Sequence, residues 1–193
     1  MTTIDLAPYV EALKRGEVVA FPTESSYGLA VDARSRAALD RLFALKEREP
    51  GKPPPLLVDG AQMLTQLVTH VPPRAQKLAD RYWPGPLTLV LPARADLPEP
   101  LVLDGGVGAR KSPHLLADRL CAQFGAPITA TSANLSGTPP AMTADEVRKA
   151  FGNRVLVLDG GPAGGGKPST VVRVGDDGTL TILRAGAIDP AQL

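Results

Sequence analysis

The chain has 193 residues, of which 44% are hydrophobic and 4% aromatic, and its 21 Lys and Arg residues nearly balance its 20 Asp and Glu residues. This length and apolar fraction exclude a disordered chain and suit one domain with a sizeable core, so we expect residues 1–193 to form a single domain. The net charge of +1 argues against a protein that coats nucleic acid by bulk charge, although a local basic patch is compatible with it.

Cysteine and histidine are scarce. Cys121, His70 and His114 are too few to supply a disulfide or a structural zinc site. The first 17 residues carry early acids and no long apolar stretch, so no signal peptide is expected, and no apolar run approaches the roughly 20 residues that span a bilayer. We therefore expect a cytoplasmic protein without a membrane partner.

The N-terminal half predicts alternating helices and strands. In chain order these are a helix over 6–13, a strand over 18–21, a helix over 36–46, a strand over 56–58, and helices over 61–70 and 73–82. The first helix follows from apolar residues spaced by three and four positions, and Ser35 is placed to cap the second. The prolines of the tract 48–55, between the second helix and the strand over 56–58, exclude regular structure there.

The C-terminal half adds more strands than helices. In chain order these are strands over 87–91 and 107–110, a helix over 113–124, a strand over 128–130, a short helix after Thr143, and strands over 154–158, 170–174 and 179–183. Thr143 and Glu146 form a capping-box pattern, and residues 176–178 (DDG) predict a hairpin turn. Strands and helices therefore intermix, which predicts an α/β fold with a mixed sheet.

Residues 161–167 (GPAGGGK) match part of a phosphate-binding P-loop. Two features argue against that interpretation. Pro168 stands where a Ser or Thr hydroxyl would reach magnesium, and the residues that follow resemble a strand instead of the helix that completes the anion site. We interpret the segment as a glycine-rich loop between strands, able to close over a ligand.

Signals of covalent catalysis are missing. Ser132 and Ser136 lie in a loop of small residues, but neither is in a G-x-S-x-G elbow. Cys121 falls on the apolar face of a predicted helix, beside Leu120 and Phe124, which indicates a core position. No nucleophilic side chain is therefore predicted.

Hydroxyl groups and cations gather in loops after predicted strands. Residues 22–28 (PTESSYG) and 131–137 (TSANLSG) each follow a buried strand, and ligands bind at the carboxyl ends of strands in open α/β sheets. Small side chains there let backbone N–H groups approach an anion. Arg110 and Arg184 also follow strands, although strand-end arginines equally form salt bridges at the rim.

Three further cations, Lys46, Arg48 and Lys52, alternate along a helix end and the proline-stiffened loop. A stiff loop holds charged donors in place, which suits a polyphosphate or a carboxylate. For Lys46 alone, the alternative of a lysine that complements the helix dipole is favoured.

Seven motifs in this chain occur in the order and spacing of the YrdC-like family. They are PTESSYGL, the Lys46-x-Arg48 pair followed by KPPPLLV, WPGPLTLVL, VGARKSPH, TSANLSG, PSTVV and ILRAGAI. Each is weak alone, but all seven in register over residues 10–188 are specific, so the chain resembles this family over nearly its whole length. The resemblance implies an α/β domain with a twisted mixed β-sheet flanked by helices, whose concave, electropositive face holds the site.

The resemblance also implies a nucleotidyltransferase. Relatives of this form join L-threonine, bicarbonate or CO₂, and ATP into threonylcarbamoyl-AMP and release pyrophosphate, for the modification of an adenosine in certain tRNAs. It further implies Mg²⁺ bound with ATP, downstream proteins that transfer the threonylcarbamoyl group, and tRNA as a partner on the concave basic face.

Site residues are carried over from the family position by position. The threonine pocket would be lined by Thr23, Arg110, Ser132 and Ser169, and ATP would be held by Lys46, Arg48, Lys52, Asn134 and Arg184. Arg110 is the expected partner of the threonine carboxylate, through bidentate geometry. No side chain is expected to bind the metal or to act as a catalyst by itself. Positioning and charge neutralisation would carry the rate, with Lys46 and Arg48 closest to that role.

The chain departs from the family pattern at a few positions. The prolines at 53–55 shift the loop alignment by a residue, and Val58 and Asp59 stand where some relatives have a histidine that touches threonine. Ala185 replaces a common proline. Because the chain ends at Leu193, soon after ILRAGAI, we expect the form without a longer C-terminal module.

Two alternatives remain open. An RNA-binding protein of the same fold without synthase activity would have a basic concave face and a steep salt dependence. Balanced charge and few aromatic residues do not favour it, and the intact Ser132-Ala133-Asn134 run favours the synthase. A carbamoyl-transfer domain like those of hydrogenase-maturation proteins is the second, and it usually belongs to a much longer chain.

Overall fold

The strands form two hydrogen-bonded sheets in the computed structural model, which describes residues 4–47 and 51–193. The four-stranded sheet has the order β7-β2-β1-β8 and contains β1 (Val19–Pro22), β2 (Tyr27–Ala30), β7 (Thr131–Ser132) and β8 (Leu156–Val157). β1 and β2 are an antiparallel hairpin, whereas β8 runs parallel to β1. Every residue of β1 and β2 is buried, so this hairpin is a central part of the core.

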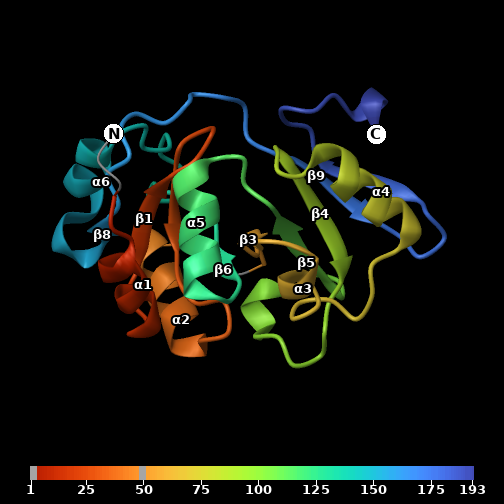
Figure 1. Ribbon diagram of the computed structural model, residues 1–193, viewed down its shortest axis with the longest axis horizontal. Helices are drawn as coiled ribbons and strands as arrows, with labels where there is room; N and C mark the ends of the chain where they lie inside the picture. The colour runs from red at the N-terminus through yellow and green to blue at the C-terminus, as the bar shows by residue number, and fades with distance from the viewer. Residues whose placement is uncertain (1–3, 48–50) are drawn as a thin grey trace.

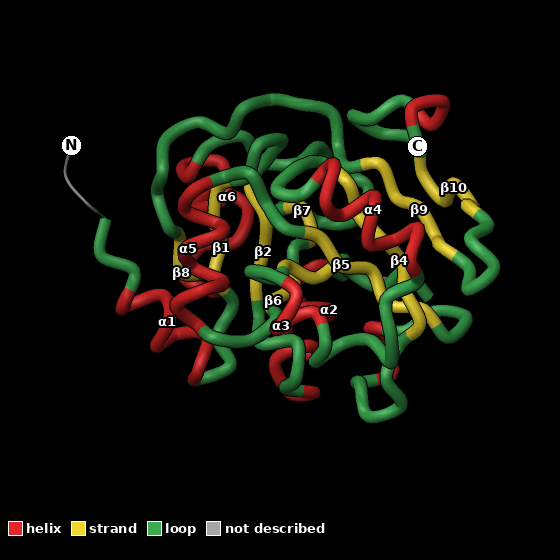
Figure 2. Tube along the Cα trace, turned by 45° about the vertical axis from the view of Figure 1, so that its right-hand side comes forward, coloured by secondary structure: helices red, strands yellow, loops and turns green. Residues whose placement is uncertain are grey.

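The second sheet has the order β10-β9-β4-β5-β3-β6. Its strands are β3 (Leu56–Leu57), β4 (Leu87–Pro92), β5 (Gly106–Arg110), β6 (Ile128–Thr129), β9 (Thr170–Val174) and β10 (Leu180–Arg184). β4 is antiparallel to β5 and parallel to β9, and β10 closes an antiparallel hairpin with β9. Both sheets are therefore mixed. Figure 2 shows β1 and β2 on one side of the molecule and β4 and β9 on the other.

The two sheets are joined at β6 and β7, which only Ala130 separates in the chain. The buried Thr129 completes the junction. Its Oγ1 donates to Leu29 O at 3.1 Å and accepts from Val31 N at 3.0 Å, so a β6 side chain bonds to the β2 end of the other sheet. The 131–137 loop therefore starts from a fixed point between the sheets.

Six α-helices occur among the described residues. They are α1 (Ala7–Lys14), α2 (Arg36–Lys46), α3 (Ala61–Leu64), α4 (Pro73–Tyr82), α5 (Leu115–Phe124) and α6 (Ala144–Phe151). α1 and α5 contact each other and β1, and α4 contacts β4 (Figure 1). Ser35 caps α2 and a complete capping box formed by Thr143 and Glu146 opens α6, as predicted. No helix in the described part of the chain is long and apolar enough to cross a membrane.

One long segment crosses from the first sheet to the second. Residues 160–168, here called the glycine strap, run between β8 and β9 without regular structure, along the top of the view in Figure 1. The Tyr27 hydroxyl donates to Gly161 O at 2.7 Å and anchors the start of the strap. Because β9 follows and no helix does, the interpretation of 161–167 as a loop between strands is confirmed.

The α/β fold with mixed strand directions is confirmed, but several details differ from expectation. The strands form two sheets where one was expected, and residues 27–30 and 131–132, placed in loops, form β2 and β7. The helix predicted over 61–70 covers only Ala61–Leu64. Beyond it, Val68 and Thr69 pair with the end of β4 through a bridge to Ala93 and a bond to Pro92 O, so tertiary pairing overrides the helical pattern.

Candidate active site

A cavity of about 1020 Å³ is lined by residues of both sheets. The first sheet contributes the turn at 23–26 and residues of β2 and β7. The second contributes side chains of β4, β5, β9 and β10. The proline loop 51–55 and the glycine strap also line the cavity, as do Leu103, Ala130, Pro140 and Met142. Segments far apart in the sequence therefore meet at one cavity.

Four cationic side chains line the cavity. Lys52, Arg110, Arg173 and Arg184 line it, and no acidic residue is among the described residues that do so. In a concave site, the electrostatic potentials of several cations add up, and this raises the local concentration of anionic ligands. The cavity is therefore suited to anions.

Arg110, at the end of β5, is buried and paired. Its guanidinium donates to both carboxylate oxygens of Glu24, through a short bond from Nη1 to Oε1 and a bond of 3.4 Å from Nη2 to Oε2. The side chains of Arg110 and Glu24 are 6% and 22% exposed. Ser112 Oγ adds a bond of 3.3 Å to Glu24 Oε2. The guanidinium is thus held in one orientation at the cavity wall.

Arg184 lies at the end of β10 and packs against Ser169. Its Nη2 donates to Ser169 O at 2.7 Å and to Ser169 Oγ at 3.0 Å, and that hydroxyl is 2.8 Å from Thr88 Oγ1. Partial burial and the positive charge of Arg110 together lower the pKa of the Arg184 guanidinium. Two like charges held near each other in this way favour an anion between or beside them.

The side chain of Thr23 organises the turn between β1 and β2. Its Oγ1 donates to Ser26 O at 2.6 Å and accepts from the backbone N of Ser25 and of Ser26. These bonds are the ST-turn pattern, in which a hydroxyl replaces a backbone group. Thr23, Ser25 and Ser26 all line the cavity, so the turn presents hydroxyl groups to it.

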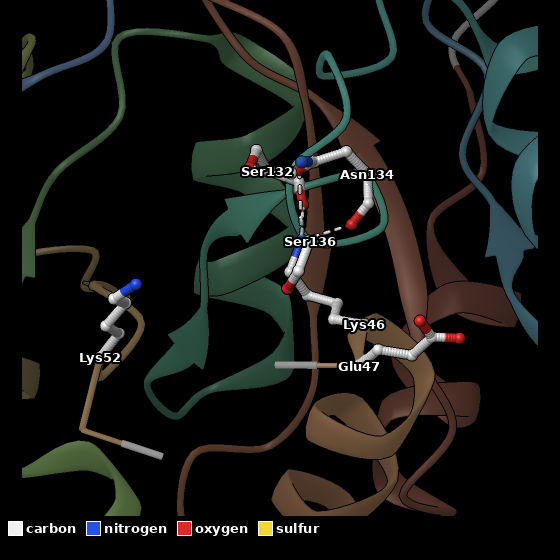
Figure 3. Close-up of a pocket in the computed structure, with 7 residues that line it drawn as sticks. Lys46, Glu47, Lys52, Ser132, Asn134 and Ser136 are labelled. Carbon is white, nitrogen blue, oxygen red and sulfur yellow. Dashed lines mark hydrogen bonds between the residues drawn. The ribbon is translucent and has the colours of Figure 1, made fainter. Parts of the chain in front are cut away.

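A second cavity of about 500 Å³ adjoins the first, and Lys52 and Ser132 line both. Figure 3 shows Lys46 at the end of α2 pointing to the loop that carries Ser132 and Asn134, with Lys52 on the opposite loop. Lys46 is 3% exposed, and its Nζ donates to Ser132 O, to Asn134 O at 2.7 Å and to Asn134 Oδ1 at 3.3 Å. Lys46 therefore fastens the 131–137 loop to α2.

Asn134 completes this loop from within. Its Oδ1 accepts from Ser132 Oγ at 2.6 Å, and its Nδ2 donates to Leu135 O and Thr138 O. Both ends of the side-chain amide are thus used inside the protein. The structure places Asn134 at the smaller cavity as a residue that shapes the loop.

The glycine strap closes one side of the large cavity. Gly165 N donates to Ser25 O at 3.1 Å and Gly166 N to Glu24 O at 3.3 Å, so the strap lies against the turn that follows β1. A Cβ atom at Gly164 would come within 2.6 Å of Glu24 O, which only glycine avoids. The strap is therefore bonded to the backbone of the residue that holds Arg110.

Of the nine residues carried over from the family, eight lie at these two cavities and one cannot be placed. Thr23, Lys52, Arg110, Ser132, Ser169 and Arg184 line the larger cavity, and Lys46, Lys52, Ser132 and Asn134 line the smaller one. Arg48 lies outside the described residues.

Three residues at or next to the cavity, Thr88, Arg173 and Glu24, were not predicted as site residues. Arg173 lines the cavity and donates to Asp104 O at 2.9 Å, and Thr88 meets Ser169. Arg173 had a signal, because strand alternation puts Val171 and Arg173 on the face opposite the buried Val172 and Val174. Glu24 lies in the PTESSYGL motif, but its partner Arg110 is 86 positions away, so nothing in the neighbouring sequence predicts this pair.

The described residues offer no resident metal site. No group of three or more His, Cys, Asp or Glu side chains among them is close enough to hold an ion. The cations that line the large cavity would also repel a bare metal ion. No step is therefore assigned to a metal bound by the side chains described.

Comparisons with known proteins show what the chain is similar to. The Sua5/YciO/YrdC family model, described as "Telomere recombination", matches residues 11–186. The chain is 43% identical over 176 residues to the threonylcarbamoyl-AMP synthase of Thiobacillus denitrificans, covering 90% of this chain and 91% of that protein. It is 38% identical over 191 residues to the protein of that name from Bacillus subtilis, covering 97% of this chain and 55% of the relative.

The structure is also similar to solved structures. It superposes on Sua5 of P. abyssi complexed with L-threonine with a TM-score of 0.91 and 32% sequence identity. The match covers 99% of this chain and 57% of the P. abyssi chain. This chain therefore spans little more than half the length of some of its relatives and nearly the whole length of others.

Proposed function

Since the chain belongs to the Sua5/YciO/YrdC family, we propose that it forms threonylcarbamoyl-AMP and pyrophosphate from L-threonine, bicarbonate or CO₂, and ATP. The curated relatives at 43% and 38% identity carry the name of this synthase, which favours the proposal over an RNA-binding protein of the same fold. The activity is that of a nucleotidyltransferase. Its product would be used for the threonylcarbamoyl modification of tRNA.

The observation that carries the proposal is the cavity lined by four cations. ATP, the threonine carboxylate and bicarbonate are all anions, and Lys52, Arg110, Arg173 and Arg184 supply the opposing charge. A volume of about 1020 Å³ lies at the upper end of the range of ligand pockets, which suits a nucleotide together with an amino acid.

We assign the residue roles on the same basis. Arg110, with its fixed guanidinium, would bind the threonine carboxylate, and the hydroxyls of Thr23, Ser132 and Ser169 would surround the rest of that substrate. Lys52, Arg184 and Arg48 would bind the phosphates of ATP. Lys46 and Asn134 would act on ATP mainly by shaping the loop beside it.

The chemistry requires no covalent enzyme intermediate. The deprotonated threonine amine adds to CO₂ and releases a proton to give a carbamate. A carbamate oxygen then attacks the α-phosphorus of ATP, and the bond to the β-phosphate oxygen breaks as pyrophosphate leaves. The residues would hold the reactants in line and neutralise their charge. Mg²⁺ would enter as part of the ATP substrate.

The partners follow from the product. A threonylcarbamoyl adenylate is a reactive mixed anhydride, so we propose that downstream transfer proteins and tRNA receive its acyl group, in the cytoplasm where tRNA is modified. Direct contact of tRNA with the positive cavity face would belong to the same proposal.

The proposal is tested by pyrophosphate release with each substrate omitted in turn. Release should require ATP, L-threonine and bicarbonate together. Arg110→Ala should lower kcat/KM for threonine by at least about 100-fold, because a fixed bidentate partner of the carboxylate is lost. The exposed Arg36 on α2, paired only to Asp40 among the contacts described, provides the matched control Arg36→Ala, which should retain activity. A folded protein that releases pyrophosphate without threonine would refute the proposal.

A further inference from the structure

Glu24 occupies an unusual place, next to the site but not in its wall. Its neighbours Thr23, Ser25 and Ser26 line the large cavity, whereas Glu24 is outside the set of described residues that line it. Its carboxylate instead reaches Arg110 and Ser112, both of them buried. A ligand in the cavity would meet the guanidinium of Arg110, with Glu24 on another side of it.

The geometry points to Glu24 as the positioning residue for Arg110: we propose that the paired carboxylate and guanidinium, with Ser112, set the orientation in which Arg110 meets the carboxylate of the amino-acid substrate. This inference deepens the proposed function and rests on it. Glu24 touches no substrate and acts through the guanidinium alone.

Three physical arguments support this role. A buried guanidinium with free rotation would have several orientations, and a bidentate ligand requires one of them. The positive charge of Arg110 contributes to the lowered pKa of Arg184, so the two guanidinium groups repel each other. A nearby carboxylate such as that of Glu24 offsets this repulsion. The carboxylate of Glu24, whose side chain is 22% exposed, accepts one hydrogen bond from Nη1 and one from Nη2 of Arg110. The other N–H groups of the guanidinium are then available to a ligand on another side.

The backbone of Glu24 is itself fixed from the other side. Gly166 N donates to Glu24 O, and Gly164 approaches that oxygen so closely that a Cβ atom would collide with it. The glycine strap therefore holds the backbone of Glu24, and the carboxylate of Glu24 holds the guanidinium of Arg110, which would bind the substrate carboxylate.

The test compares L-threonine with L-threoninamide, which has the same amine and hydroxyl but no carboxylate. Binding of each to the full chain is measured by isothermal titration calorimetry for the wild type and for Glu24→Gln, which keeps the shape and removes the charge. The Kd for threonine should rise by about tenfold or more, because the orientation of Arg110 is lost. The Kd for threoninamide should change by less than about twofold, because Arg110 adds little to its binding.

Controls separate positioning from a general loss of structure. Glu24→Asp, which keeps the charge, should recover part of the threonine affinity, and Glu17→Gln, which breaks an exposed pair with Arg15, should leave both ligands unaffected. In an Arg110→Ala background, Glu24→Gln should cause no further loss. The near-ultraviolet circular dichroism of each variant verifies that it is folded.

The outcomes are distinct. Equal weakening of threonine and threoninamide, or unchanged binding of both by a folded Glu24→Gln chain, would overturn the positioning role. Failure of the wild-type chain to release pyrophosphate from ATP, threonine and bicarbonate would instead refute the proposed function. The two results come from separate measurements and cannot be confused.

Discussion

At the residue scale, Lys46 shows how a charged side chain can become structural. Its ammonium is buried and donates to two backbone carbonyls and one side-chain oxygen of the 131–137 loop. In return, Ser136 N donates to Lys46 O at 3.1 Å. The sequence favoured a role of Lys46 at the helix dipole, because the partners seen in the structure lie about 86 to 90 positions away from Lys46 in the chain.

Lys46→Met is therefore expected to damage both stability and activity. Methionine fills a similar volume but leaves the carbonyls of Ser132 and Asn134 without their donor, which costs about 1–3 kcal/mol of unfolding free energy. Urea unfolding followed by circular dichroism measures the loss, and the KM for ATP should rise at the same time. Lys14→Met, at an exposed pair with Glu11, is the control and should change stability by less than about 0.5 kcal/mol. A Lys46→Met chain with unchanged unfolding free energy would show that the 131–137 loop does not depend on Lys46 for its stability.

At the element scale, the glycine strap illustrates why a motif needs its surroundings to be interpreted. Its sequence suggests a phosphate cradle, but the segment is held by the Tyr27 hydroxyl, by Met142 O and by the turn at 24–25. Two of its glycines, Gly164 and Gly166, lie close to the backbone oxygen of Glu24, and Gly161 and Gly165 have positive φ angles that favour glycine. The strap is therefore a wall of the cavity whose position depends on the turn that it covers.

Gly164→Ala should displace this wall. The added methyl group cannot fit 2.6 Å from the backbone oxygen of Glu24, so the strap must move, at a cost of about 1–3 kcal/mol typical of overpacking. We expect a lower thermal midpoint and a higher KM for threonine. Gly60→Ala is the matched control, since a Cβ atom at Gly60 has no described atom within 4 Å. An unchanged KM in the Gly164→Ala chain would contradict the role of the strap.

At the scale of the whole molecule, residues of both sheets belong to one apolar cluster that includes Phe21, Leu57 and Leu120. This continuity supports our proposal that the chain folds as a single domain. Cys121 lies within the cluster, 1% exposed, with its Sγ 3.4 Å from Leu57 O of the second sheet. Its expected core position is confirmed.

The same cysteine makes a probe of global unfolding. Burial, with smaller contributions from the charges of Asp59 and Asp118, raises the pKa of the Cys121 thiol to about 12. At pH 8 the thiolate, which is the reactive form, should be roughly three orders of magnitude rarer than in an unfolded chain. Labelling with a thiol reagent should therefore be very slow in the native state and should accelerate together with the loss of circular dichroism in urea. Rapid labelling of the native chain would show that α5 opens locally.

Local signals account for most of the helices and for the longer strands. Ser35, Thr143 and Glu146 mark helix starts through caps that depend on neighbours within four positions, and the structure contains those caps. The two-residue strands β3 and β6 fall within the predicted strands 56–58 and 128–130. β7 was placed in a loop, and it exists because β2, about 100 positions earlier in the chain, completes its ladder. The lost part of the helix over 61–70 has the same cause, since that segment pairs with the end of β4.

The fold class, the family and the kinds of residues at the site could be predicted from the chain alone, because caps and prolines act on nearby residues and the order of the motifs is a property of the linear sequence. The pairing of Arg110 with Glu24 and the attachment of the 131–137 loop to Lys46 could be found only from the folded structure. Each of these depends on contacts between segments tens of residues apart or on opposite sheets. Hydrogen bonds and charges act over a few ångströms, so their partners are fixed only when the two sheets are brought together.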